Sequence, residues 1–407
     1  MRCGATGRTV KRGRYRGKRP VVAALAVAVL GTTAACSGEL TRDTPARPGA
    51  AEAGTPGAAR GFTLVATGDL LVHDSVIRQA AADSGGSSSG SGYDFGPMLA
   101  AAKPLVSGAD VALCHMETVY GASGGPYTGY PLFKSPPQIA RSVRDLGYHS
   151  CSTASNHTLD AGAEGVSRTL GALDAARLRH TGSARSAKEG GATTFLKAGG
   201  ATVAHLAYTY GTNGIPVPAD RPWLVNLLDP ERVVHDARAA RRAGADVVVV
   251  STHWGTEWQQ EPDQEQLDVA QRLTRSATGG RRDIDLVIGT HNHVPQPYEK
   301  VNGTWVVYGL GDQIAGRMND ARGQLGTAAR FTFAPPRKPG AAWHVKKAEA
   351  LPFRVDNDPL RLVDLNSALA EDPGRTDYTH ARDTIRQAVL SRGARSAGLV
   401  FAPGEPG

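Results

Sequence analysis

Apolar runs of strand length alternate with amphipathic stretches from residue 62 onward. The apolar runs cover residues 62–67, 110–114, 147–154, 202–208, 246–252, 284–289 and 305–310. Helical spacing is found between them, over residues 138–146, 165–177, 230–243 and 264–276. Strands that alternate with helices predict an α/β layered fold.

The pattern changes after residue 329. Residues 330–333 and 342–350 are typical of paired strands, and a charged helical tail is expected over 364–392. Earlier, the Gly/Ser-rich stretch 84–91 predicts a surface loop. Residues 121–137, rich in Gly, Pro and Tyr, form a longer segment that we expect to cover a site.

Five of the apolar runs end within a few residues of a polar side chain that can bind metal. These side chains are Asp69, Glu117, Asn156 with His157, His253, and His291 with His293. In α/β proteins the carboxyl ends of parallel strands share one sheet edge, where sites are usually found. We therefore expect these groups to meet there.

Each of these residues alone also has an ordinary structural explanation. Asp69 fits a turn after Gly68, Asn156 fits a helix cap, and His253 beside Trp254 fits a packed core histidine. The repetition at five strand ends favours a common site. His73 and His115 stay open, since each fits a ligand, a group behind the ligands or a polar surface residue.

The donor set indicates the kind of metal. Carboxylate, amide and imidazole groups without thiolate suit Mn, Fe, Zn or Co and do not suit a closed structural zinc. Seven donors are more than one such ion usually binds, whereas two ions that share a carboxylate can bind all seven. Such a pair, about 3.5–4 Å apart, clamps a phosphoryl oxygen and activates water.

Six short motifs resemble the bacterial capsule synthesis protein CapA family (poly-γ-glutamate type) of the calcineurin-like metallophosphatase superfamily. They are Gly68-Asp69, His115-Met116-Glu117, Ser155-Asn156-His157-Thr158-Leu159-Asp160, His253-Trp254-Gly255-x-Glu257, Gly289-Thr290-His291-Asn292-His293-Val294-Pro295-Gln296 and Tyr308-Gly309-Leu310-Gly311-Asp312. The resemblance covers residues 62–351 and implies a four-layer α-β-β-α sandwich. Residues 352–407 are then a C-terminal extension with a helical tail.

The resemblance also implies roles for individual residues. The metal ligands would be Asp69, Glu117, Asn156, His253, His291 and His293. His157 would be the acid or transition-state stabiliser beside two divalent ions of the Mn, Fe or Zn class. On the substrate side we expect Lys134, before a Pro-Pro pair, together with His73 and Glu257.

This sequence departs from the usual family motifs at three places. His115-Met116-Glu117 stands where Asn-Leu-Glu is usual, Ser155-Asn156-His157 where Asn-Asn-His is usual, and Gly311-Asp312-Gln313 where Gly-Asn-Phe is usual. None of these changes removes an expected ligand.

The net charge of +8 in 407 residues comes from the N-terminus. Eight Lys and Arg precede residue 37 without an acid, which leaves 38 basic and 38 acidic residues in the rest. The excess therefore indicates an export signal rather than nucleic-acid binding.

Residues 1–36 are expected to be a signal peptide. An apolar core over 21–35 ends at a lipobox-like Cys36, which predicts a lipid anchor on the mature protein. Ordinary cleavage after an Ala-x-Ala-like site and an uncleaved anchor are the alternatives. Residues 37–61 are expected to be a flexible linker, and every version places the body outside the cytoplasm.

Two cysteines, Cys114 and Cys151, lie in the body of the chain. We expect two buried thiols, with a disulfide as the alternative, because the sequence does not fix the distance between them.

Three functions fit these observations. The first is an extracytoplasmic, metal-dependent phosphoesterase-like hydrolase in capsule, poly-γ-glutamate or other anionic cell-envelope polymer assembly, acting with the proteins of that assembly. The second is a non-catalytic scaffold for export or anchoring of such a polymer. The third is a hydrolase or transferase that acts on poly-γ-glutamate itself.

Overall fold

The computed structural model describes residues 59–85, 92–338 and 341–402. All of them belong to one compact unit, Pro56–Gly407. The expected signal peptide, Cys36, nearly all of the linker and most of the Gly/Ser loop lie outside the described residues. Among the residues described, every helix is too short or too polar to cross a lipid bilayer.

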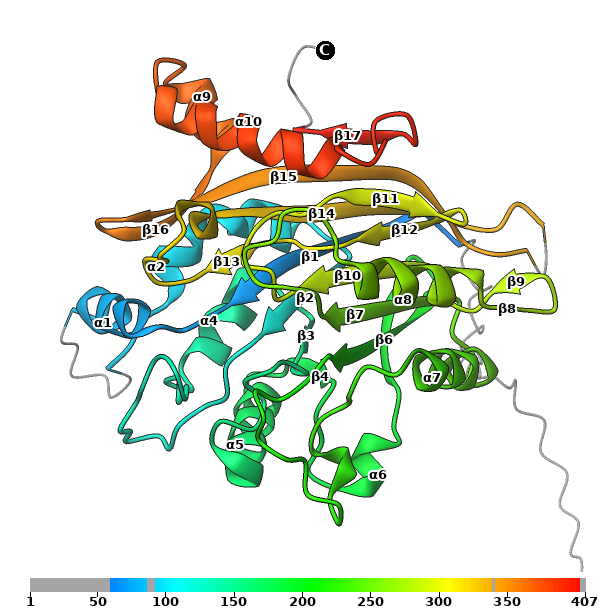
Figure 1. Ribbon diagram of the computed structural model, residues 1–407, viewed down its shortest axis with the longest axis horizontal. Helices are drawn as coiled ribbons and strands as arrows, with labels where there is room; N and C mark the ends of the chain where they lie inside the picture. Colours follow the sequence, from blue (N-terminus) through cyan, green and yellow to red (C-terminus); the bar gives the residue numbers. More distant parts are fainter. Residues whose placement is uncertain (1–58, 86–91, 339–340, 403–407) are drawn as a thin grey trace, which may run out of the picture. The chain divides into compact units, whose positions relative to one another are not determined.

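Two mixed sheets form the centre of this unit (Figure 1). The first has the strand order β16-β15-β14-β1-β2-β3-β4, with β13 beside β1 and β17 beside β15. Strands β1 to β4 are parallel to one another, and β14 to β16 are antiparallel. Their bounds are β1 Phe62–Leu70, β2 Val111–Met116, β3 Ser150–Ser152, β4 Arg179–Thr181, β13 Asp312–Ile314, β14 Leu325–Ala334, β15 His344–Asn357, β16 Leu360–Asp364 and β17 Leu399–Phe401.

The second sheet has the order β11-β12-β10-β7-β6-β5. Its inner strands are parallel, and β5 and β11 are antiparallel edges. The bounds are β5 Thr194–Ala198, β6 Ala201–Thr209, β7 Val247–His253, β10 Leu286–Thr290, β11 Tyr298–Val301 and β12 Thr304–Val307. A short hairpin, β8 Ala277–Thr278 and β9 Arg281–Arg282, stands apart from it.

Helices cover the outer face of each sheet. On the first sheet lie α1 Asp74–Asp83, α2 Gly96–Leu99, α3 Lys103–Ser107, α4 Ile139–Leu146 and α5 Gly162–Ala175. On the second lie α7 Pro230–Arg242 and α8 Gln264–Arg275. The inner faces share one core, in which Leu64 and Leu113 of the first sheet lie with Val249 and Ile288 of the second. The predicted α-β-β-α sandwich is therefore confirmed.

The C-terminal segment continues the first sheet. Strand β15 runs through Leu351 without a break, and β14 pairs with it as the sequence predicted. The expected tail is two helices, α9 Leu365–Glu371 and α10 Thr376–Leu390, because the chain turns at Asp372. Figure 1 shows α10 lying along β15, where Ile385 and Val389 enter the inner core.

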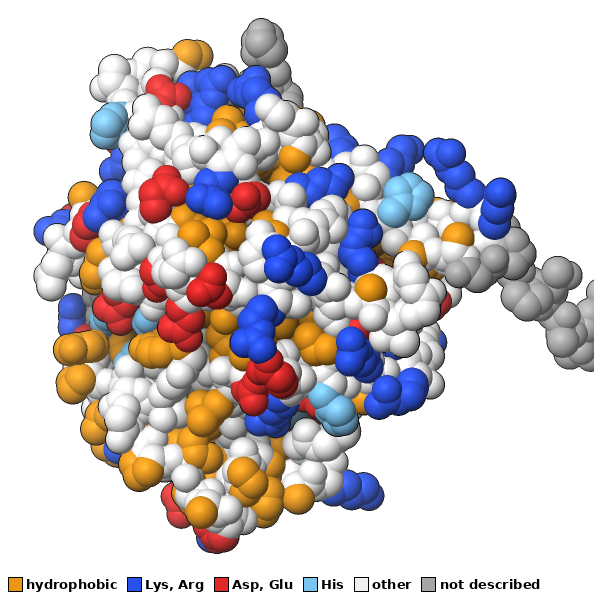
Figure 2. Space-filling view, turned by 45° about the vertical axis from the view of Figure 1, so that its right-hand side comes forward, with side chains coloured by type: hydrophobic (Ala, Val, Ile, Leu, Met, Phe, Trp, Pro, Cys, Tyr) orange, Lys and Arg blue, Asp and Glu red, His pale blue; other side chains and the backbone are white. Residues whose placement is uncertain are grey.

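Side chains of opposite charge pair on the outer helices. Figure 2 shows acidic and basic side chains interspersed on the face that carries α7 and α8. Arg238 of α7 pairs with Asp283 at 2.9 Å, and Arg272 of α8 pairs with Glu231. The Arg272–Glu231 pair is exposed and contributes little to stability, whereas Asp283 is buried.

Cys114 and Cys151 form a disulfide, so the expectation of two free thiols is wrong. The two residues lie directly opposite each other on the parallel neighbours β2 and β3. Their Cα atoms are 4.5 Å apart, within the range that a disulfide can span. The sequence shows neither that β2 and β3 are neighbours nor the register between them.

Candidate metal centre

Strand ends from both sheets meet at one edge of the sandwich. Asp69 lies near the end of β1, opposite His115 of β2 on one side and Asp312 of β13 on the other. Glu117 follows β2 directly. From the second sheet, His253 ends β7 and lies opposite Thr290, the last residue of β10. Parallel pairing therefore fixes the positions of the ligand-type side chains.

The turn after β10 has an unusual backbone. His291 and His293 have φ values of 96° and 54°, in the left-handed region that residues with a Cβ rarely adopt. Before them, Gly289 packs so closely against the residue after β12 that a Cβ there would lie 1.9 Å from the Tyr308 carbonyl oxygen. Strain of this kind is concentrated at functional sites, where the surrounding structure maintains it.

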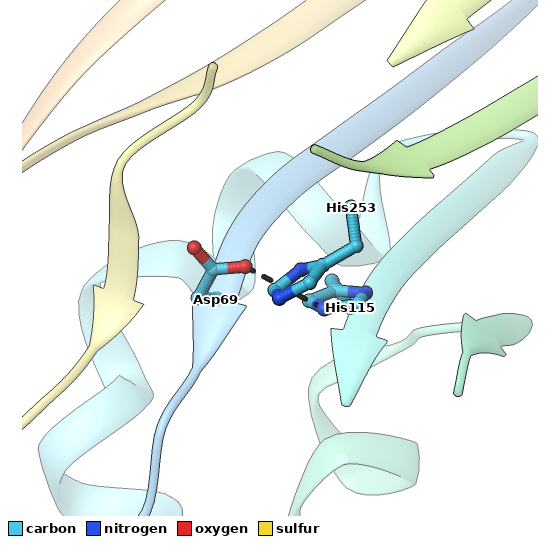
Figure 3. Close-up of side chains that lie close together, drawn as sticks. All are labelled: Asp69, His115 and His253. Atoms are coloured by element: carbon cyan, nitrogen blue, oxygen red, sulfur yellow. Dashed lines mark ion pairs between the residues drawn. The ribbon is translucent and has the colours of Figure 1, made fainter. Parts of the chain in front are cut away.

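The side chains form two overlapping groups that share Asp69: Asp69, His115 and His253, shown in Figure 3, and Asp69, Glu117 and His293. The Asp69 carboxylate lies 3.6 Å from His115 Nε2 and 3.7 Å from His293 Nδ1. Glu117 Oε1 lies 3.9 Å from His253 Nε2 and 4.0 Å from His293 Nε2. These separations are too long for hydrogen bonds.

Several atoms of these groups are buried without a hydrogen-bond partner. They are Asp69 Oδ1, His115 Nε2, both carboxylate oxygens of Glu117, His291 Nδ1 and Asp312 Oδ2. Burying an unpaired carboxylate oxygen is costly, and a cation is the usual compensation. The buried clusters therefore have the chemistry of a metal-binding centre.

The pKa shifts agree with this conclusion. Burial raises the pKa of Asp69 to about 7 and that of Glu117 well above its usual range, and Asp312 adds to both shifts by repulsion. Burial, together with the neighbouring imidazoles, lowers the pKa of His253 and of His291. These two histidines are therefore neutral, as metal ligands must be. Asp312 and Glu117 instead raise the pKa of His293 against the effect of burial.

Groups behind the candidate ligands orient two of the rings. His293 Nδ1 donates to Asp312 Oδ1 at 2.9 Å, and His253 Nδ1 lies 3.1 Å from Thr290 Oγ1. The His293 ring therefore presents Nε2 to the centre, as is typical of histidine ligands. His253 Nε2 faces the same centre but lies 2.8 Å from Asn156 Oδ1, so that two predicted ligands contact each other.

His157 lies beside these groups, between the centre and an opening. Its Nδ1 donates to Asp160 Oδ2 at 2.7 Å, and the same oxygen accepts the Phe133 N–H at 2.8 Å. The Phe133 ring contacts the imidazole edge-on, with 4.6 Å between ring centroids. The ring is therefore fixed with Nε2 free.

Comparison with protein families decides the relationship. The model of the bacterial capsule synthesis protein PGA_cap family matches residues 63–317, which is more than half of the chain. The chain belongs to the PGA_cap family. All the groups described above, from Asp69 to Asp312, lie within the matched residues.

Individual relatives are distant. The PGA biosynthesis protein CapA of Bacillus subtilis (strain 168) is 29% identical over 44% of this chain, and the chain spans 45% of that protein. A "Probable polyglutamine synthesis accessory protein" of Mycobacterium tuberculosis is 28% identical over 70% of this chain and 74% of its own length.

Two solved structures are also similar. One is the calcineurin-like phosphoesterase YfkN of Bacillus subtilis, with a TM-score of 0.42 and 15% identity over 72% of this chain and 90% of that chain. The other is a 5'-nucleotidase precursor of Thermus thermophilus, with a TM-score of 0.42 and 15% identity over 81% of this chain and 59% of that chain.

The residues expected on the substrate side of this PGA_cap chain lie at different places. His73 and Glu257 line a cavity of about 370 Å³ beside the centre, together with His157 and His293. Glu257 is exposed and is close enough to His291 and His293 to share an ion with them. Lys134 is absent from the described lining of this cavity, although Tyr130 and Phe133 of the same segment contribute to it.

Sequence reasoning gave no role to two acids of this site, Asp312 and Asp160. The signal for Asp312 was present, since it follows the apolar run 305–310 and a glycine, as Asp69 follows Gly68. Asp160 is part of the motif around His157, but the sequence gives no sign that it contacts that ring. Its role depends on the turn that brings it back to that ring.

Proposed function

We propose that this chain is an extracytoplasmic metal-dependent hydrolase of the CapA type, acting on a phosphoester-like bond in the assembly of a capsule, poly-γ-glutamate or another anionic envelope polymer. The observation that carries this proposal is the convergence of partnerless carboxylate oxygens and imidazole nitrogens at one sheet edge. Family membership supports the pathway.

The proposed cofactor is a pair of divalent ions of the Mn, Fe or Zn class, held by Asp69, Glu117, Asn156, His253, His291 and His293. Such ions polarise a phosphoryl oxygen and lower the pKa of water. Asp69 belongs to both overlapping groups and would be shared between the two positions. The protein's own contribution is to hold the donors in place before substrate arrives.

His157 is the proposed proton donor to the leaving group. Asp160 accepts the Nδ1 hydrogen at 2.7 Å, which fixes the ring orientation and leaves Nε2 to exchange a proton with substrate. The edge-on contact with Phe133 limits rotation of the ring. Because the His157 side chain is only 7% exposed, little bulk water competes for that proton.

The lining of the cavity offers one basic side chain to an acidic substrate and also includes the acid Glu257. Arg317 is the one Lys or Arg side chain among its described lining residues. The segment 317–319 also forms a wall of a second cavity, of about 640 Å³, that extends to α10. Arg322 and Arg354 also line this second cavity, where they pair with Asp320 and Asp377. We therefore assign the substrate contact expected of Lys134 to Arg317.

Replacing Arg317 by Gln should weaken binding of a fluorescent poly-γ-glutamate oligomer roughly tenfold, the value of about 1.4 kcal/mol expected for a charge-assisted hydrogen bond. Fluorescence anisotropy on the full chain, at low and high salt, measures this loss. Lys134→Gln is the matched control and should bind like wild type. An equal loss in both variants would show only a general effect of charge.

The proposed location is outside the cytoplasm, with a lipid anchor at Cys36 and polymer assembly proteins as partners. Two observations support it: the basic and apolar leader, and the Cys114–Cys151 disulfide. Disulfides persist in oxidising compartments and are rare in the cytosol.

The test of function is metal-dependent turnover. The full chain, purified without chelator, should contain a divalent metal and hydrolyse bis(p-nitrophenyl) phosphate. EDTA should abolish this activity, Mn²⁺ should restore it, and His291→Ala should prevent the recovery. Metal-loaded protein that binds acidic polymer but cleaves no ester or amide would favour the scaffold function instead.

A further inference from the structure

Two histidines in the core of the sandwich differ in one respect. His115 on β2 and His205 on β6 are both buried, and each has Nδ1 within hydrogen-bond distance of a serine hydroxyl, at 2.7 Å from Ser152 and 3.0 Å from Ser150. His205 Nε2 has a second serine partner, Ser251, at 2.9 Å. His115 Nε2 has no partner. His205 is thus a satisfied core histidine, and His115 is not.

The hydrogen bonds around His115 accommodate a hydrogen on Nδ1. The Ser152 hydroxyl lies 2.7 Å from His115 Nδ1 and can accept that hydrogen while it donates to the Cys114 carbonyl oxygen at 3.4 Å. In that tautomer a neutral imidazole has no hydrogen on Nε2, which presents its lone pair.

That lone pair faces another acceptor. His115 Nε2 lies 3.6 Å from Asp69 Oδ1, and neither atom has a hydrogen-bond partner. The ring stacks on His253 with 4.7 Å between centroids, and Figure 3 shows the three side chains facing one space. A cation between two buried acceptors that face each other in this way would satisfy both of them.

We propose that His115 is itself a metal ligand, bound through Nε2 to the ion shared with Asp69 and His253. The proposal rests on the metal centre of the proposed function and adds a nitrogen to the six donors assigned there. The ion position formed by Asp69, His115 and His253 then has two nitrogen ligands, which favours Zn or Fe over Mn at that position.

The test compares His115→Asn with His205→Asn. The asparagine amide takes the place of the imidazole Nδ1 and keeps a bond to serine, while the Nε2 position is lost. The shorter asparagine side chain does not reach the ion. We therefore expect one of the two sites to bind Co²⁺ roughly 10–100-fold more weakly in this variant. Removal of a group that only orients a ligand already lowers metal affinity by this factor. The visible spectrum of the Co²⁺ form should change as well. His205→Asn should leave both the affinity and the spectrum unchanged.

A second measurement requires no variant. In a crystal structure of the full chain grown with Co²⁺, the anomalous peak should lie about 2.0–2.1 Å from His115 Nε2, the usual length of a bond from imidazole nitrogen to such a metal. An ion bound by Asp69 and His253, with His115 Nε2 beyond bonding distance, would overturn the proposal and leave the proposed function standing. Wild-type protein that binds no Co²⁺ would overturn both.

Discussion

The Asp69→Asn variant of the full chain should bind Mn²⁺ at least roughly 100-fold more weakly than wild type and lose its metal-dependent turnover. Asp69 is fully buried, and its carboxylate belongs to both overlapping ligand groups. A neutral amide at this position removes the charge that both ions share. Isothermal titration with Mn²⁺ and phosphodiester hydrolysis measure the two losses.

The same variant should be more stable than wild type when metal is absent. In the metal-free protein Asp69 Oδ1 has no partner, and Asp69 repels Asp312 and Glu117. Removing one buried charge from this cluster should raise the free energy of unfolding by about 1–3 kcal/mol.

Added Mn²⁺ should then stabilise wild type and leave Asp69→Asn unchanged. The control is Asp110→Asn, which lies beside β2 at the opposite sheet edge and bonds to Thr63 and Arg60. It should retain both metal binding and turnover. An Asp69→Asn protein that still gains thermal stability from Mn²⁺ would contradict the assignment of Asp69.

The His157→Asn variant should lose roughly 10²–10⁴-fold in kcat, the usual contribution of a positioned general acid. Its metal content should equal that of wild type, because His157 hydrogen-bonds to Asp160 and belongs to neither ligand group. Steady-state kinetics with metal analysis of the same sample separates the two effects.

Asp160→Asn provides the companion variant. It keeps the size of the side chain but loses the charge that accepts the His157 hydrogen at 2.7 Å. We expect a smaller loss in kcat and a shifted pH profile, since Asp160 acts through His157. If His157→Asn lost metal together with activity, His157 would be a ligand and the acid would have to be sought elsewhere.

Most of the candidate ligands could be predicted from the sequence because the rule behind them is local. An apolar run that ends near a polar residue predicts a strand and the loop after it, and parallel strands place those ends together. Asp69, Glu117, His253 and His293 all satisfy this rule, and the structure brings them to one edge. Asp312 satisfies it too.

What could not be predicted depends on contacts between distant parts of the chain. The disulfide required the register of β2 against β3. Arg317 is proposed in place of Lys134 because residues 317–319, after β13, line the cavity, which no local pattern shows. The lack of a partner at His115 Nε2 depends on the packing of the two sheets. His205 is also buried beside a serine hydroxyl, but its Nε2 has a second serine partner.

The bridge between β2 and β3 lies one residue before both members of the His115–Ser152 pair. Until that bond closes, the two strands that orient the proposed nitrogen donor are not yet tied together covalently. For an exported chain, an oxidising environment would close this bond, and the register that places His115 beside Ser152 would then be held covalently.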